Sequence, residues 1–83
     1  MQLEVLTPEK NVFSGKVNLV KLPGSIGSFE ILKNHAPIIS ALTEGELKID
    51  TQSGETLRYK MSGGVVEVNN NHIVVLVESI ASK

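Results

Sequence analysis

The stretch GELKIDTQSGETLRYKM, residues 45–61, decides the fold class of this chain. In its first half Leu47 and Ile49 alternate with charged residues, and in its second half Leu57, Tyr59 and Met61 alternate with polar ones. A period of two is typical of a strand with one buried face and one face in water. The intervening TQSG, residues 51–54, has the composition of a hairpin turn. The stretch therefore predicts two antiparallel strands.

The same alternation and turn signals recur along the rest of the chain. An asparagine-rich turn at residues 69–71 separates the apolar runs 65–68 and 73–77, and asparagine tolerates the left-handed backbone angles of such turns. Turn signals recur about every 8–12 residues, which is typical of a sandwich or barrel. No long window carries a helical apolar stripe. We predict an all-β sandwich formed by a single domain over residues 1–83.

Two strands depart from simple alternation. Around residues 16–22, Val17 and Leu19 lie in one phase while Val20 and Leu22 lie in the other, so we expect a bulge near Leu19. Residues 73–77 are continuously apolar and rich in β-branched side chains, so we expect a strand covered on both faces.

Composition excludes several function classes. The chain has 83 residues and no cysteine, so it has neither a disulfide framework nor a thiolate metal site. Eight basic residues are scattered among nine acidic ones without a cationic stripe, which argues against nucleic-acid binding. The longest apolar run is too short to cross a bilayer, and the first residues do not resemble a signal peptide. We therefore expect membrane association only through a partner.

The candidate chemical groups are few. His35 could act as a general base near Glu30 or Ser40, but a loop histidine bonded to its own turn is the simpler interpretation. His35 and His72 lack the companions and spacing of a zinc site. The segment Gly24–Gly27 lacks the Gly-Lys-Ser/Thr ending of a phosphate loop. The pair Gly63-Gly64 predicts a bulge or a close backbone approach. We predict no cofactor, no metal and no catalysis.

Three motifs in order carry a family resemblance. They are VFSG at residues 12–15, LPGSIGSFEILKNHAPIISAL at residues 22–42, and SGGVVEV at residues 62–68. Together they resemble the epsilon subunit of the F-type, proton-driven rotary ATP synthase, over residues 3 to 81. The resemblance implies a flattened sandwich of about ten short, mainly antiparallel strands.

The resemblance also implies a role and partners. In that family the domain is a rotor part of the central stalk, which joins the gamma subunit to the membrane ring of c subunits, at the cytoplasmic face of the bacterial cell membrane. The nucleotide chemistry takes place on other subunits. Carried onto this sequence, the gamma-facing residues are Thr7, Asn34, His35, Ile38, Ser40 and Leu42. The ring-facing residues are Gly24, Ser25, Ile26, Gly27, Ser28, Phe29 and Glu30. Ile38 and Leu42 could equally be core residues.

The sequence departs from the family pattern at three places. Ser28 stands where the family often has Glu, and Glu30 where it often has Gly, so we expect Glu30 to supply that acid on the same strand face. Lys33 replaces a common Pro. Most bacterial relatives continue into a two-helix hairpin that this sequence lacks. Either the protein is naturally short, which we expect, or the sequence is a piece of a longer chain.

Two other functions are compatible with the sequence alone. A free-standing sandwich that binds carbohydrate or peptide usually exposes aromatic rings, and here Phe13, Phe29 and Tyr59 are mostly in core phase. A minimal hydrolase would depend on His35.

Overall fold

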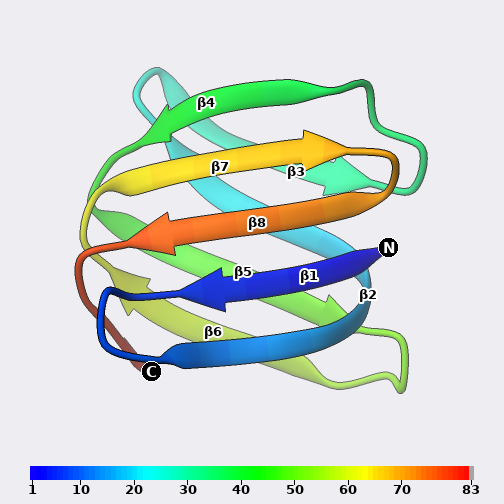
Figure 1. Ribbon diagram of the computed structural model, residues 1–83, viewed down its shortest axis with the longest axis horizontal. Coiled ribbons are helices and arrows are strands. Elements are labelled where there is room, and N and C mark those ends of the chain that lie inside the picture. Colours follow the sequence, from blue (N-terminus) through cyan, green and yellow to red (C-terminus); the bar gives the residue numbers. More distant parts are fainter. Residues whose placement is uncertain (83) are drawn as a thin grey trace.

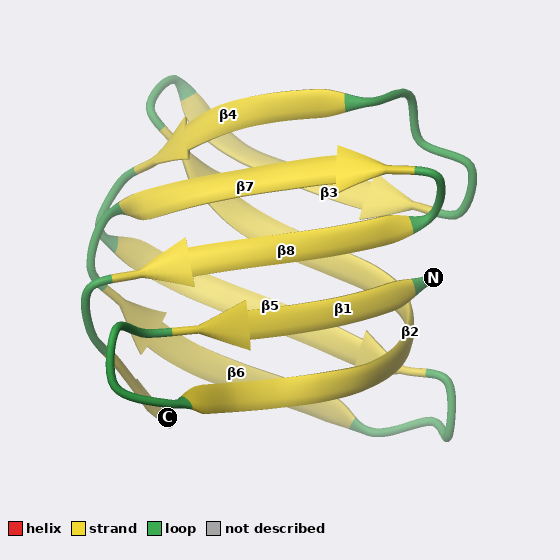
Figure 2. Cartoon of the chain, in the orientation of Figure 1, coloured by secondary structure: helices red, strands yellow, loops and turns green. Residues whose placement is uncertain are grey.

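The computed structural model describes residues 1–82 and is built from strands. Figure 2 shows that turns and loops connect the strands directly, and within residues 1–82 there is no helix and hence no helix that could span a membrane. The strands of this part of the chain are β1 (Gln2–Leu6), β2 (Asn11–Gly24), β3 (Gly27–Leu32), β4 (Ile38–Leu42), β5 (Gly45–Thr51), β6 (Thr56–Met61), β7 (Gly64–Asn69), β8 (His72–Val77) and β9 (Ile80–Ser82).

The strands form two layers, as Figure 1 shows. The front layer has the order β4-β7-β8-β1 and is continued by the first half of β2. The back layer contains β3, the second half of β2, and then β5, β6 and β9. All pairings are antiparallel except that of β1 with β8. The predicted all-β sandwich is confirmed, although extents of 26 × 25 × 22 Å make it only slightly flattened.

Strand β2 connects the two layers. Its residues 11–16 pair with β1 in the front layer, and residues 17–24 pair with β5 and β3 behind. The register with β5 shifts between Val17 and Leu19, which confirms the predicted bulge. Because a bulge increases local twist and bends its strand, it lets one strand of 14 residues serve both layers.

The core is formed by the inward side chains of both layers. Alternate residues of each strand point inward, and fifteen apolar side chains are buried as a single cluster. Leu3 and Val5 enter it from β1, Leu47 and Ile49 from β5, and Ile31 from β3. At about 25 cal/mol per Å² of apolar area removed from water, this cluster supplies the main stabilisation of the fold. The alternation in residues 45–61 therefore identified real inward faces.

The predicted turns are also present. The residues 51–54 join β5 to β6, and Asn70 and Asn71 join β7 to β8 with positive φ values of 51° and 60°. Gly64 makes the close backbone approach predicted for the glycine pair, since a Cβ there would overlap the carbonyl oxygen of Leu76 on β8.

The prediction for residues 73–77 is wrong. Ile73, Val75 and Val77 are buried, but Val74 is only half-buried and Leu76 is 46% exposed. Strand β8 therefore has one face in the core and one apolar face that nothing in the described chain covers. The run lacks alternation because its outer face is also apolar, and not because a second layer of this chain covers it.

Candidate functional site: an apolar sheet face and a hairpin tip

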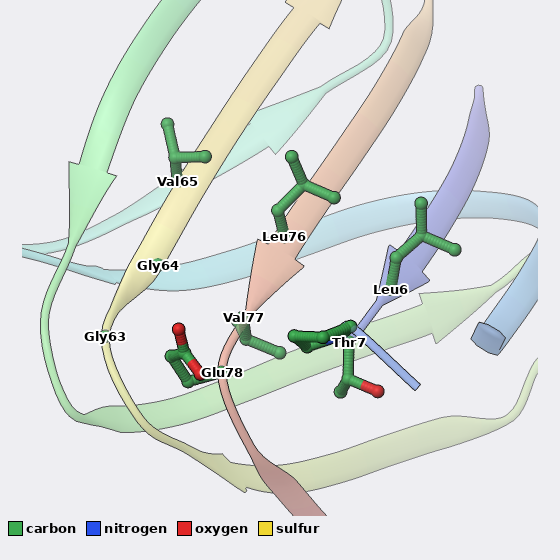
Figure 3. A pocket seen from close by; sticks show the side chains of 9 residues that line it. Leu6, Thr7, Gly63, Gly64, Val65, Leu76, Val77 and Glu78 are labelled. Carbon is green, nitrogen blue, oxygen red and sulfur yellow. The ribbon is translucent and has the colours of Figure 1, made fainter. Parts of the chain in front are cut away.

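The outer face of the front layer carries apolar side chains in register. Leu6 on β1 is the pairing partner of Leu76 on β8, Leu76 pairs with Val65 on β7, and Val65 pairs with Ala41 on β4. These four residues, called here the apolar row, cross four adjacent strands, and each is at least partly exposed. Figure 3 shows Leu6, Leu76 and Val65 side by side on the same side of the sheet.

A shallow hollow lies at the apolar row, and Leu6, Val65 and Leu76 are part of its lining. It has a volume of about 290 Å³ and is also lined by the ends of β1, β7 and β8, including Thr7, Gly63, Gly64 and Glu78 (Figure 3). The two glycines permit close packing, since a Cβ atom at Gly63 would lie 3.0 Å from the carbonyl oxygen of Leu42, and one at Gly64 would overlap that of Leu76.

A second row, one residue pair further along the strands, is mixed in character. It contains Glu4, Val74, Glu67 and Ile39 on β1, β8, β7 and β4. Ile39 is 73% exposed. The carboxylate of Glu4 lies 2.7 Å from the Nε2 atom of His72 on the adjacent strand. The outer face therefore combines exposed apolar groups with carboxylates.

The six residues predicted to face gamma lie in three parts of the front layer. Thr7 follows β1 and lines the hollow, with its hydroxyl bonded to the backbone of Lys10. Ile38 and Ser40 lie on β4, where Ile38 is half-buried against the core. Leu42 is only 6% exposed, so its side chain belongs to the core, and the interface hypothesis has to be corrected there.

Asn34 and His35 lie in the turn between β3 and β4, and this turn is fixed by hydrogen bonds. The backbone N–H of Asn34 donates to Oδ1 of Asn71 at 2.7 Å, and Nδ2 of Asn71 donates to Oδ1 of Asn34 at 3.0 Å. Both asparagines have left-handed backbones, with φ values of 65° and 60°. The Nδ1 atom of His35 lies 2.7 Å from the carbonyl oxygen of Ala36. The histidine thus bonds to its own turn.

The seven residues predicted to face the ring form the β2–β3 hairpin. Gly24 pairs with Gly27, and Ser25 and Ile26 form the tip between them. The Ile26 side chain is fully exposed. Ser28 and Glu30 lie on the same, exposed side of β3, as their spacing predicts, whereas Phe29 packs against the core. The hairpin therefore presents an apolar tip and a nearby carboxylate.

The structure brings the two predicted sets of residues together. A hollow of about 600 Å³ is lined by residues 24–29 of the hairpin and by Ile38, Ile39 and Ser40 of β4. The predicted ring-facing tip and part of the predicted gamma-facing strand are thus neighbours at one edge of the sandwich. The outward residues Leu6, Val65 and Leu76 were missed from the sequence, because an apolar residue in a strand gives no sign of which face it occupies.

The chemistry that this arrangement offers is that of contact surfaces. Within residues 1–82, no three His, Cys, Asp or Glu side chains are close enough together to hold a metal ion. Each histidine has its own hydrogen-bond partner. His35 bonds to Ala36, and His72 bonds to Glu4. Binding through exposed apolar rows and a carboxylate-bearing rim is what these groups support.

Comparison with known proteins agrees with this geometry. The family model of the ATP synthase delta/epsilon chain β-sandwich domain matches residues 1–83. The chain belongs to this family. It is 42% identical over 78 residues to the ATP synthase epsilon chain of Desulforamulus reducens, and 35% identical over 79 residues to that of Chlorobaculum tepidum.

The epsilon-family relatives differ in length. This chain spans 58% of the Desulforamulus epsilon chain but 90% of the Chlorobaculum one. Among solved structures, a chain of the Euglena gracilis mitochondrial ATP synthase superposes with a TM-score of 0.87 at 18% identity, over 96% of this chain and 51% of that one. A chain of the Tetrahymena thermophila mitochondrial central stalk and c-ring gives 0.80 at 21% identity, over 98% and 65%. Both show that this fold is shared.

Proposed function

We propose that this chain is a non-catalytic central-stalk subunit of an F-type ATP synthase, which couples the gamma subunit to the c-ring during proton-driven ATP synthesis. The observation that carries the proposal is the apolar row, exposed across four adjacent strands of the front layer. Exposed contiguous apolar surface is typical of an interface with another protein. The curated relatives are named as epsilon chains of this enzyme.

The front face is the proposed docking face for gamma. Leu76 and Leu6 supply the apolar centre, since a few well-packed side chains near the centre of an interface carry most of its binding energy. Thr7 lies beside the apolar row, so it is placed to form part of a polar rim, whereas Ser40 lies on the same side of β4 as Ile38 and Leu42 and borders the hollow next to the β2–β3 hairpin. Asn34 and His35 extend this rim at the far end of the layer.

The β2–β3 hairpin is the proposed contact with the c-ring. Its tip places the fully exposed Ile26 beyond the body of the sandwich, where it can insert between ring loops. Glu30 lies on an exposed side of the same hairpin, where a carboxylate can pair with a basic loop. This contact would hold the subunit at the cytoplasmic face of the bacterial cell membrane, peripherally and only through the complex.

The mechanical role follows from the architecture. Torque has to pass from the ring to the stalk through an element that deforms little. Strand β2 runs through both layers. It pairs with β1 in the front layer and with β5 and β3 in the back layer. A load applied at the hairpin tip therefore acts directly on the strand that also supports the front face.

The competing function of a free-standing binding module receives no support from the aromatic residues. Such modules present exposed rings to their ligands, and Phe13, Phe29 and Tyr59 here pack against the core. The competing hydrolase is also disfavoured, because the His35 ring faces its own turn.

The first test is complex formation with gamma. The purified chain and purified gamma subunit are mixed and run by size exclusion, beside a Leu76→Asp variant and the matched surface variant Glu55→Gln from the β5–β6 turn. We expect co-elution for the wild type and for Glu55→Gln, and loss of the complex for Leu76→Asp. Failure of the wild type to co-elute at any salt concentration would remove the gamma-docking proposal.

The second test addresses the ring. A pull-down on purified c-ring compares the wild type, Glu30→Gln and Ile26→Ser, again with Glu55→Gln as the control. We expect both hairpin variants to retain less ring. Unchanged ring capture by both would show that the hairpin is not the contact.

A further inference from the structure

We infer that the partner of the front face presents an apolar ridge bordered by basic side chains. The inference rests on the proposed docking function and adds the chemistry of the partner surface, which the family assignment does not give. It is carried by the charges on the four strands that hold the apolar row.

Of the five strand segments of the front layer, β1, β8, β7 and β4 contain no lysine or arginine, whereas the first half of β2 carries the exposed Lys16 beside Gln2. Strands β1, β8, β7 and β4 have the sequences QLEVL, HIVVLV, GVVEVN and IISAL, and their only acidic residues are Glu4 and Glu67. Glu78 adds a third carboxylate at the rim of the hollow beside the apolar row. The face is therefore apolar and acidic.

The back layer carries cations of its own. Lys21 on β2 is the pairing partner of Lys48 on β5, and Lys48 is the partner of Arg58 on β6. These three residues form a row across the back layer. Carboxylates lie beside both ends of this row, since Lys21 also pairs with Glu30 and the Arg58 guanidinium lies 2.8 Å from the Glu46 carboxylate. The back layer therefore mixes both signs of charge, whereas β1, β8, β7 and β4 carry carboxylates without lysine or arginine.

Glu67 is the carboxylate best placed to act on a partner. Glu4 already lies 2.7 Å from His72, whereas the pairing neighbours of Glu67 are Val74 and Ile39, and no ion pair of Glu67 is formed with any residue of 1–82. A carboxylate surrounded by apolar groups is stabilised when a docking surface brings a cation to it, and is penalised when the surface does not.

The charge pattern also disfavours a second copy of this chain as the occupant. Two front faces brought together would bring the carboxylates of Glu4, Glu67 and Glu78 from both copies into one interface, with no lysine or arginine from β1, β4, β7 or β8. Like charges gathered at an interface are unfavourable, so self-association through this face is opposed. A partner surface with an apolar centre and a basic border would cover the apolar row and also pair with the carboxylates.

The inference predicts separate kinetic roles for Glu67 of the second row and Leu76 of the apolar row. Charged groups at a rim mainly set the association rate and its salt dependence, whereas desolvated apolar groups mainly set the dissociation rate. With immobilised gamma, Glu67→Gln is expected to lower the association rate about threefold in low salt, and the difference is expected to vanish near 0.5 M salt. Leu76→Ala is expected to raise the dissociation rate at every salt concentration. Glu55→Gln, which removes one carboxylate from the opposite layer, is the control and should match the wild type.

A second measurement does not depend on gamma. Amide NMR spectra of the labelled chain are recorded with an amphipathic helical peptide made of leucine and lysine, and with its leucine and glutamate counterpart. We expect the lysine peptide alone to shift the amides of β1, β8, β7 and β4, and Glu67→Gln to weaken that binding.

The two measurements distinguish failure of the inference from failure of the proposed function. If the lysine peptide binds this face and gamma does not, the surface chemistry stands and the gamma proposal falls. The inference is overturned, and gamma docking stands, if two results are found together. The association rate with gamma changes neither with salt concentration nor with Glu67→Gln, and the two peptides bind the chain alike. Binding of the lysine peptide to the back layer instead would also overturn it.

Discussion

Replacement of Gly64 by alanine should be among the most damaging small changes in this protein. Gly64 begins β7 and pairs with Val77 of β8. A Cβ atom at this position would overlap the carbonyl oxygen of Leu76 and lie 3.0 Å from the Cγ1 atom of Val77. The Leu76 oxygen is a backbone atom, so it cannot rotate away as a side chain could. The two strands must separate locally to admit one methyl group.

The size of the effect can be estimated from two contributions. Forcing an extra methyl into a packed site typically costs about 1–3 kcal/mol. Separation of the strand ends also weakens at least one backbone hydrogen bond, which contributes about 1 kcal/mol. We therefore expect Gly64→Ala to lower the free energy of unfolding by about 2–4 kcal/mol. For a domain of this size, with Tm falling by about 4–8 °C for each kcal/mol, Tm should drop by roughly 10–30 °C.

The assay is urea denaturation followed by circular dichroism, with Gly15→Ala as the matched control. A Cβ at Gly15 would touch only the Phe13 ring, at 3.4 and 3.6 Å, which is ordinary van der Waals contact. Its stability should stay within about 0.5 kcal/mol of the wild type, or rise slightly because alanine restricts the unfolded chain. Equal stabilities for the two variants would refute the steric argument.

Two further changes test the core and the loop bonds. Ile31→Ala removes a fully buried side chain and should lower the free energy of unfolding by about 2–5 kcal/mol. Ile26→Ala at the exposed hairpin tip should change it very little. Equal urea midpoints for the two variants would contradict the assigned burial. Asn71→Gly keeps a left-handed backbone available but removes both side-chain bonds to Asn34. Hydrogen exchange of the Asn34 amide should therefore accelerate about tenfold, which is equivalent to about 1.4 kcal/mol. An unchanged exchange rate would show that these bonds do not protect the turn.

The local features of this fold were predictable because each depends on a few consecutive residues. The alternation of Leu47 and Ile49 with charged residues identified an inward face, and the phase change near Leu19 identified a bulge. Asparagine at residues 69–71 identified a turn through its tolerance of left-handed angles. None of these inferences required knowledge of which strands are neighbours.

The candidate site was less predictable because it is made by pairing between distant segments. Leu6 and Leu76 come from opposite ends of the sequence, and they become neighbours only because β1 inserts in parallel beside β8. The motif at residues 22–42 led to Ile26, Ser40 and their neighbours, but it could not place the outward residues of β1, β7 and β8. For the same reason the sequence left open whether Leu42 is a contact or a core residue, since spacing alone does not say which side of β4 faces the core, and the structure buries it.

The error at residues 73–77 is informative about function. A strand that is apolar on both faces conflicts with a two-layer sandwich that can cover only one of them. Such conflicts between local pattern and global fold are expected where a surface has been adapted to a partner. The conflict at β8 coincides with the absence of lysine and arginine from β1, β4, β7 and β8, which would otherwise keep an exposed sheet face solvated. Exposed Leu76 and the missing cations of these strands are therefore both accounted for by the proposal that a partner covers the front face and brings positive charge to its carboxylates.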